Sequence, residues 1–208
     1  MLFRSGRSWH NVERSKYKSI EDFAATESFL RFRKPLVDQV RDLSVDCVCE
    51  IGTGNGFFIK YLADIFPSAK LFGLDINKEI IEDNKHFYND QRITFLADSN
   101  NDFLYKKLPD NVLLISVGTF ECFTQSELEE LFSSLGNSGK KVTIALSEPF
   151  DIDLATSAKS EPRGATLFSH AYEKILTNLN FQIISKLYLK RKSEDTKENY
   201  IILTATNY

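Results

Sequence analysis

Val48-Cys-Glu-Ile-Gly-Thr-Gly-Asn-Gly-Phe-Phe58 is the stretch that decides the fold of this chain. An apolar, strand-forming run, 45–51, leads into alternating glycines, and apolar helix-forming residues follow at once. Glycines in such a turn let a ligand approach the backbone closely, and the first N–H groups of the next helix are free to bind it. The stretch therefore predicts a buried strand, a ligand-binding turn and a helix, in that order.

The spacing of the glycines separates two kinds of nucleotide-binding turn. A nicotinamide-dinucleotide turn has the pattern G-x-G-x-x-G, and its third glycine would here fall on Phe57. The chain instead has G-x-G-x-G at Gly52, Gly54 and Gly56, with Glu50 two residues before the first glycine. A pyrophosphate would be poorly placed beside the Glu50 carboxylate, so the pattern disfavours a dinucleotide.

On the C-terminal side of this turn, apolar strand-forming runs alternate with amphipathic helical patterns. Five strands are expected, at 45–51, 69–75, 92–97, 111–117 and 140–147. The helical patterns between them lie near 57–66, 78–88 and 125–135. Strands separated by such helices predict βαβ units, and hence a parallel sheet with helices on both faces.

The end of the chain has a different pattern. A helix expected near 169–179 is followed by two strand-forming runs, 181–190 and 199–206, with a charged turn between them. Two such runs predict an antiparallel hairpin added to the edge of the parallel sheet. We therefore expect an α/β fold with a seven-stranded, mostly parallel, Rossmann-like sheet and a C-terminal antiparallel hairpin.

The residues before the first strand predict a separate helical segment. We expect one or two helices in 1–43, with Pro35 either breaking them or beginning the second one. The expected division is an N-terminal helical cap or lid at 1–43 and a ligand-binding domain at 44–208. Five Lys and Arg residues against one Glu in 1–18 make the N-terminal arm basic.

Composition narrows the class of protein further. The 208 residues can bury the core of one domain, and 26 Lys and Arg against 29 Asp and Glu argue against broad binding to nucleic acid or an anionic membrane. No apolar run approaches the roughly 20 residues that span a bilayer, and the N-terminus lacks the apolar stretch of a signal peptide. A cytoplasmic protein without a membrane partner is expected. Three cysteines and three scattered histidines lack the spacing of a zinc site, so no metal is expected.

Three further motifs extend the pattern of the glycine turn. Asp75 ends the expected second strand, Asp98-Ser99 follows the third, and Thr119-Phe-Glu-Cys-Phe123 follows the fourth. With the glycine turn, these motifs resemble the class I S-adenosylmethionine-dependent methyltransferases of the small-molecule type, over roughly 45–206. The resemblance implies S-adenosyl-L-methionine as cofactor.

The resemblance also implies which residues bind this cofactor. Asp75 would accept hydrogen bonds from the ribose hydroxyls, and Asp98 would reach the adenine amino group. The implied cofactor-binding residues are Glu50, Gly52, Gly54, Gly56, Asp75, Ile76, Asp98, Ser99 and Val117. Structural alternatives remain open: a surface carboxylate for Asp75, a turn for Asp98, and a helix-dipole partner for Glu50.

Methyl transfer from a sulfonium is an in-line displacement, which requires alignment, exclusion of water and a base for a protonated acceptor. Three residues are candidates for catalysis. His170 follows a long loop expected at 148–166, Glu121 follows the fourth strand, and His10 lies in the N-terminal arm. A helix cap or surface position is the alternative for His170, and a backbone contact for Glu121.

The expected function is methyl transfer to an oxygen or nitrogen of a small-molecule metabolite. One alternative is an RNA or protein methyltransferase, which the acidic composition opposes. Another is a catalytically inactive, cofactor-binding partner subunit, because Cys122 stands where the resembled family commonly has a histidine. The sequence leaves a homodimer open and makes nucleic acid an unfavoured partner.

Overall fold

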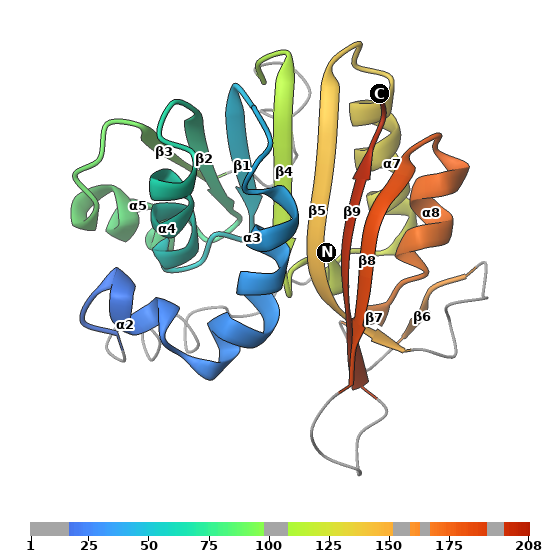
Figure 1. Cartoon of the computed structure of the whole chain (residues 1–208), viewed down its shortest axis with the longest axis horizontal. Coiled ribbons are helices and arrows are strands. Elements are labelled where there is room, and N and C mark those ends of the chain that lie inside the picture. The colour runs from blue at the N-terminus through green and yellow to red at the C-terminus, as the bar shows by residue number, and fades with distance from the viewer. Residues whose placement is uncertain (1–16, 98–107, 152–158, 163–166, 191–197) are drawn as a thin grey trace.

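A seven-stranded sheet forms the centre of the molecule (Figure 1). The computed structural model describes residues 17–97, 108–151, 159–162, 167–190 and 198–208. The strand order is β3-β2-β1-β4-β5-β9-β8. The five parallel strands are β1 Cys47–Ile51, β2 Lys70–Asp75, β3 Ile93–Ala97, β4 Asn111–Val117 and β5 Lys141–Asp151. The antiparallel hairpin is β8 Gln182–Leu189 and β9 Glu198–Thr206, so the expected fold class is confirmed.

Helices cover both faces of this sheet and create two apolar cores (Figure 1). One face packs against α4 Phe57–Ile65, α5 Lys78–Phe87 and the N-terminal helices. The other face packs against α7 Gln125–Gly136 and α8 Tyr172–Asn178. Alternate residues of the central strands enter opposite cores, as Leu113 and Leu114 of β4 do, which explains why these strands are mostly apolar.

The N-terminal helices are part of the same core as the sheet. They are α2 Ile20–Ala24, the π-helix η1 Phe29–Arg33 and α3 Lys34–Val40. Pro35 lies in the first turn of α3, close to the expectation that it begins the second helix, because the first turn of a helix needs no N–H from proline. Phe23, Phe29 and Leu36 are buried beside α4. The division into a cap and a domain stays a prediction, and residues 1–16 lie outside the described ranges.

Strand β5 is longer than expected, so the loop after it starts later than the sequence predicts. The motif Ser147-Glu-Pro-Phe150 lies inside β5, and its residues pair with β9 as far as Asp151. Strand β4 ends opposite Ser147, so the missing N–H of Pro149 interrupts no parallel ladder. The loop expected at 148–166 therefore starts after Asp151, and it contains the short strand β6 Glu161–Pro162, which pairs with β7 Phe168–Ser169.

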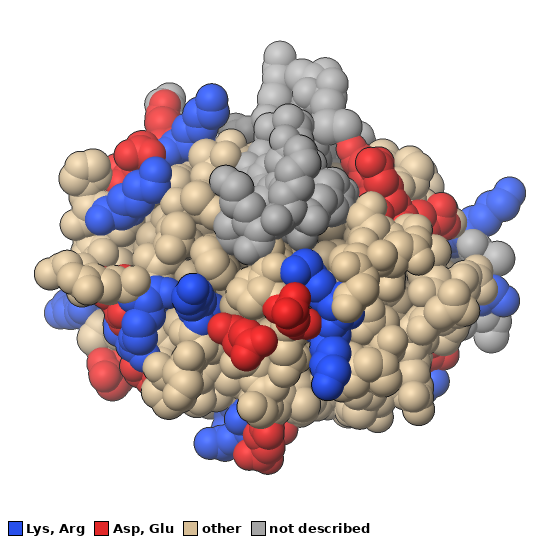
Figure 2. Space-filling model, turned by 90° about the horizontal axis from the view of Figure 1, so that it is seen from above, with Lys and Arg blue, Asp and Glu red and all other residues tan. Residues whose placement is uncertain are grey.

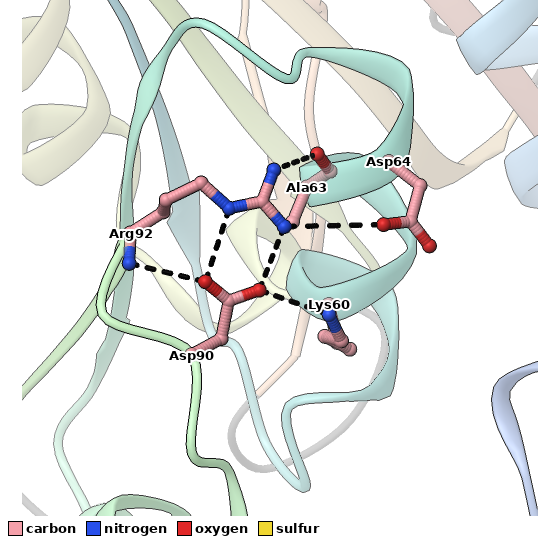
Figure 3. Close-up of polar contacts among 5 residues, drawn as sticks. All are labelled: Lys60, Ala63, Asp64, Asp90 and Arg92. Atoms are coloured by element: carbon pink, nitrogen blue, oxygen red, sulfur yellow. Dashed lines mark hydrogen bonds and ion pairs between the residues drawn. The ribbon is translucent and has the colours of Figure 1, made fainter.

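A group of polar side chains joins the end of α4 to the start of β3 (Figure 3). Asp90 Oδ2 accepts hydrogen bonds from Arg92 Nη2 at 2.7 Å and from Lys60 Nζ at 2.9 Å. Arg92 Nη1 donates to the carbonyl of Ala63 at 2.7 Å, and Asp90 Oδ1 accepts from Arg92 Nε at 3.0 Å. We call Lys60, Asp90 and Arg92 the α4–β3 clasp.

Charges of both signs are mixed at the end of the molecule where the parallel strands begin. Figure 2 shows this face from above, with Lys and Arg side chains beside Asp and Glu side chains. Lys140 and Asp110, which precede β5 and β4, form one such pair at 3.5 Å. None of the helices in the described ranges combines the length and the apolar character that crossing a membrane would require.

Candidate functional site

The glycine turn lies at the centre of the sheet, at the carboxyl end of β1. Strands β2 and β4 flank β1 on its two sides, so the connections from β1 and from β3 leave in opposite directions. Ligands of open α/β sheets bind at such a switch point, outside the carboxyl ends of the strands. The turn follows β1 directly and ends at Gly56, the N-cap of α4.

Gly52 is the position where this turn most needs glycine. Its φ angle is +74°, in the left-handed region that other residues rarely adopt. A Cβ at Gly52 would lie 2.1 Å from Oγ1 of Thr119, which follows β4. The side chain of Thr119, from the turn after β4, therefore packs directly against the backbone of Gly52.

Asp75 connects the glycine turn to the end of β2. Its carboxylate accepts hydrogen bonds from the N–H of Gly54 at 3.0 Å and from the N–H of Asn77 at 2.9 Å. From the opposite side, the buried amide of Asn84 on α5 donates to the carbonyl of Gly54 at 2.7 Å. Sequence reasoning missed Asn84, although a polar residue on the apolar face of an amphipathic helix is a signal that could have found it.

A cavity of about 180 Å³ opens between the glycine turn, β4 and the N-terminal helices. Its lining combines apolar rings, the glycine turn and two side chains of opposite formal charge. The lining residues are Phe23, Arg33, Glu50, Gly52, Thr53, Gly54, Asn55, Phe58, Val117, Gly118 and Thr119. Four of the predicted cofactor-binding positions, Glu50, Gly52, Gly54 and Val117, thus share one cavity.

Glu50 is the acidic group of this cavity, and only 4% of the residue is exposed. Its Oε2 accepts a hydrogen bond from Oγ1 of Thr53 at 2.7 Å. Burial raises the pKa of Glu50 to about 8, against the opposing effects of the Thr53 hydrogen bond and the positive charge of Arg33. Glu50 can therefore gain or lose a proton near neutral pH as its surroundings change.

Arg33 is the cationic group of the cavity and was missed by sequence reasoning. It is the last residue of the π-helix η1, and its guanidinium lies 5.4 Å from the ring centre of Phe23 and 5.6 Å from that of Phe58. π-Helices are rare and are frequent at functional sites. In the sequence, Phe29-Leu-Arg-Phe-Arg33 has no feature that separates this arginine from a solvated one.

The other predicted cofactor-binding residues lie around the cavity or outside the described ranges. Gly56 ends the turn, and Asp75 is linked to the cavity through its hydrogen bond with Gly54. Ile76 follows β2 and is 47% exposed, which leaves an apolar side chain open to a ligand. Asp98 and Ser99 belong to residues that the structure does not describe.

The catalytic candidates lie at different depths. Glu121 belongs to the short 3₁₀-helix η2 Phe120–Cys122, in the turn that continues from the cavity wall. His170 is fully buried, with its ring near those of Phe168 and Tyr172, and it is not among the described residues that line the cavity.

His170 Nδ1 lies 2.6 Å from Oγ of Ser160. Burial lowers the pKa of His170 to about 4, so the ring is neutral at pH 7. His10 lies outside the described ranges. A catalytic role for any of the three stays a prediction.

Comparison with known proteins is consistent with this geometry. Residues 48–140 match a family that is described as a methyltransferase domain. The fold is that of the class I, S-adenosylmethionine-dependent methyltransferases, and residues 48–140 are similar to their methyltransferase domain. The sheet order of the methyltransferase domain and its C-terminal hairpin agree with this class.

Individual relatives match the methyltransferase domain over different lengths. Malonyl-acyl-carrier-protein O-methyltransferase from Anoxybacillus flavithermus is 38% identical over 78 residues, which are 37% of this chain and 29% of that protein. The match thus spans less than a third of the length of this curated relative.

Solved structures share the fold over nearly the whole chain. Magnesium protoporphyrin IX methyltransferase from Synechocystis PCC 6803 has a TM-score of 0.62 at 16% identity, covering 96% of this chain and 94% of that one. A S-adenosylmethionine-dependent methyltransferase from Aquifex aeolicus has a TM-score of 0.60 at 17% identity, covering 91% and 97%. At such identities the likeness is one of fold.

Proposed function

We propose that this chain is an enzyme that transfers a methyl group from S-adenosylmethionine to an oxygen or nitrogen of a small-molecule metabolite. The observation that carries the proposal is the cavity beside the glycine turn, which both Arg33 and Glu50 line. The amino-acid end of the donor carries one carboxylate and one ammonium group. A cation and a buried acid beside a turn with close backbone approach fit such an end.

The described residues fit the donor at three of its groups. Arg33 would bind the carboxylate, and Glu50 in its charged form would bind the ammonium group. Asp75 would accept hydrogen bonds from the ribose hydroxyls. Although Asp75 already accepts two backbone N–H groups, a carboxylate has about four lone-pair sites and can accept further donors.

The bound donor supplies an activated methyl group on a sulfonium. The chain's own residues align the reacting groups and exclude water from the cavity. The rings of Phe23 and Phe58 form apolar walls that keep water from the cavity. The contact between Thr119 and Gly52 fixes the distance between the two turns. Alignment of this kind is the main requirement of an in-line displacement.

Glu121 is our first choice for the general base that takes the acceptor's proton. Its turn begins with Val117, Gly118 and Thr119, which line the cavity. The neutral ring of His170 packs behind the same turn, so His170 is the second choice. His10 is the third, in the N-terminal arm that would cover the site as a lid.

The donor site is tested by calorimetry with S-adenosylhomocysteine, the demethylated product. We expect the wild-type chain to bind it and Asp75→Ala to bind at least about tenfold more weakly, because hydrogen bonds to a carboxylate are lost. Asp110→Ala is the matched control, since this side chain is 97% exposed at the opposite end of the sheet. Absence of binding to the wild type contradicts the proposed function, and equal binding to Asp75→Ala moves the site elsewhere.

The acceptor class is tested by transfer of labelled methyl from the donor to separate substrate pools. We expect labelled product with a small-metabolite extract and none with RNA. A malonyl thioester of an acyl carrier protein belongs in the panel, because the curated relative is named for that acceptor. Labelling of the RNA pool alone would replace the small-molecule assignment, and absence of transfer to every pool would favour the inactive partner subunit.

A further inference from the structure

Glu148 is a fully buried acid that neither the sequence motifs nor the donor site uses. It lies in β5, immediately beyond Ser147, where β4 stops pairing with this strand. Its other neighbour is β9, in which Ile201 pairs with it. The backbone of Glu148 is therefore held by the sheet, while its side chain meets the chain that leaves β4.

The carboxylate of Glu148 accepts hydrogen bonds from the backbone N–H groups that follow β4, where the β4–β5 ladder has ended. The last bond of the β4–β5 ladder runs from the N–H of Gly118 to the carbonyl of Ser147, at 3.0 Å. Beyond it, Glu148 Oε1 accepts from the N–H of Thr119 at 3.1 Å, and Oε2 accepts from the N–H of Glu121 at 3.4 Å. The hydroxyl of Ser116 also donates to Oε1, at 2.7 Å.

These bonds fix the residues that close the donor cavity. We call residues 118–122 the post-β4 turn. Its first two residues line the cavity, and the side chain of Thr119 occupies the space that a Cβ at Gly52 would need. A shift of the post-β4 turn would therefore change the contact with the glycine turn and the shape of the cavity wall.

We propose that Glu148 is a positioning residue of the methyl-donor site, whose buried carboxylate holds the post-β4 turn against the glycine turn. The role rests on the donor site proposed above and requires no contact between Glu148 and the donor. It requires a carboxylate rather than an amide, because both oxygens must accept hydrogen bonds from the turn.

The charge of Glu148 is sensitive to pH in the neutral range. Burial raises its pKa to about 7, and the hydrogen bonds from Ser116 and the post-β4 turn act in the opposite direction. Among the described residues, the charge of Glu121 raises the pKa of Glu148 further, Cys122 interacts with Glu148 electrostatically, and His170 lies against the same turn at Phe120 and Phe123. Cys122 and His170 are uncharged at pH 7, since their pKa values are about 11 and about 4.

The test compares S-adenosylhomocysteine affinity of the wild type and Glu148→Gln between pH 6 and pH 8.5. At pH 8.5 we expect the wild type to bind S-adenosylhomocysteine about tenfold more tightly than Glu148→Gln does. At pH 6, where the wild-type carboxyl is protonated, the ratio of the two dissociation constants should approach one. Taking the ratio cancels the titration of Glu50, which both proteins share. A ratio that is one throughout, or that does not change with pH, overturns the proposal.

Two variants separate positioning from loss of structure. Ser147→Ala is the matched control, because its hydroxyl is buried on the same strand without a hydrogen-bond partner among the described residues, and we expect wild-type affinity at every pH. Ser116→Ala removes one donor to Glu148, so the pH at which the affinity rises should move upward. An unmoved midpoint in Ser116→Ala contradicts the proposal even if Glu148→Gln fails to fold.

The outcome also separates this proposal from the donor site itself. If the wild type does not bind S-adenosylhomocysteine, the donor site fails and Glu148 has nothing to position. If the wild type binds and Glu148→Gln binds equally well, only the role of Glu148 fails.

Phe120 packs in the core against Phe132, with ring centres 5.4 Å apart, so the turn keeps an apolar anchor in the Glu148→Gln variant.

Discussion

Single residues decide what the cavity can recognise. Glu50 and Arg33 come from segments that are 17 positions apart, yet both line the same cavity. Glu50 belongs to a motif with fixed spacing, which is why the sequence could predict it. Arg33 depends on the path of the π-helix η1, and its neighbours in sequence give no sign of that path.

Arg33→Met should weaken binding of S-adenosylhomocysteine about tenfold or more, because a charged partner of the ligand's carboxylate is lost. Methionine keeps a long apolar side chain between Phe23 and Phe58, so the cavity wall should persist. Calorimetry with methylthioadenosine, which lacks the amino-acid end, supplies the contrast, and its affinity should not change.

Arg31→Met on the same helix is the matched control. Arg31 donates to the carbonyl of Lys190 and does not line the cavity, so both ligands should keep their wild-type affinity. If Arg33→Met weakened both ligands equally, the arginine would support the fold of the site rather than bind the carboxylate.

At the scale of elements, most of the fold was predicted by two sequence features: the alternation of strand-forming and helical segments, and the residues typical of turns. The five parallel strands and the hairpin lie within a few residues of their expected ranges, because their apolar runs are bounded by helix caps and turns. Asn77 caps the start of α5, and Thr124 caps the start of α7 in a capping box with Glu127. These signals are local, so the sequence contains them.

The features that the sequence missed depend on which elements become neighbours. The sequence predicts that the fifth strand ends at residue 147, whereas pairing with β9 extends the strand past Pro149 to Asp151. On that prediction, Glu148 lies outside the sheet and has no role. The turn after β4 donates hydrogen bonds to the carboxylate of Glu148. These hydrogen bonds exist only because β4 and β5 lie side by side in the fold.

The α4–β3 clasp gives a prediction about stability between elements. Arg92→Met should lower the free energy of unfolding by about 1–3 kcal/mol at pH 7, because Asp90, which is 15% exposed, loses its main partner. For a chain of this length the melting temperature should fall by about 2–4 °C per kcal/mol. Differential scanning calorimetry measures both quantities.

The effect of the clasp should depend on pH with a definite sign. The Arg92 guanidinium holds the pKa of Asp90 well below its ordinary value of 3.8. A lowered pKa contributes stability above the ordinary value and loses it as the pH falls, so the difference between wild type and Arg92→Met should shrink below about pH 4. Lys85→Met, which breaks an exposed pair with Glu82, is the control and should leave the free energy of unfolding nearly unchanged. A difference that stays constant down to pH 2.5 would contradict the proposed role of the ion pair.

At the scale of the whole molecule, the two cores and the functional site make opposite demands. The cores favour apolar residues at the carboxyl ends of β1 and β5, whereas the site places Glu50 and Glu148 there. Burial raises the pKa of both acids, to about 8 and about 7. Each acid that ionises in the folded chain therefore reduces stability, a cost that strained or polar functional sites commonly impose.

Glu50→Gln should separate stability from binding. Below pH 4.5, the ordinary pKa of this carboxyl, Glu50 is protonated in both states and its stabilising contribution is complete. Between 4.5 and about 8 the unfolded chain releases the proton first, so the contribution is lost as the pH rises. Glutamine does not titrate, so the free energy of unfolding of Glu50→Gln should rise relative to that of the wild type between pH 5 and pH 8, by on the order of a few kcal/mol. The melting temperatures of the two proteins across this pH range measure the difference.

The exposed Glu130→Gln is the matched control and should show no such gain. S-adenosylhomocysteine adds the second half of the test. Because its ammonium group favours the charged form of Glu50, binding at pH 7 should release a proton from the wild type and none from Glu50→Gln, as calorimetry in buffers of different ionisation enthalpy would detect. A stability gain without a difference in proton release would leave Glu50 a buried acid with no part in donor binding. The two results together would show that the site keeps this acid for its ligand, at the expense of the fold.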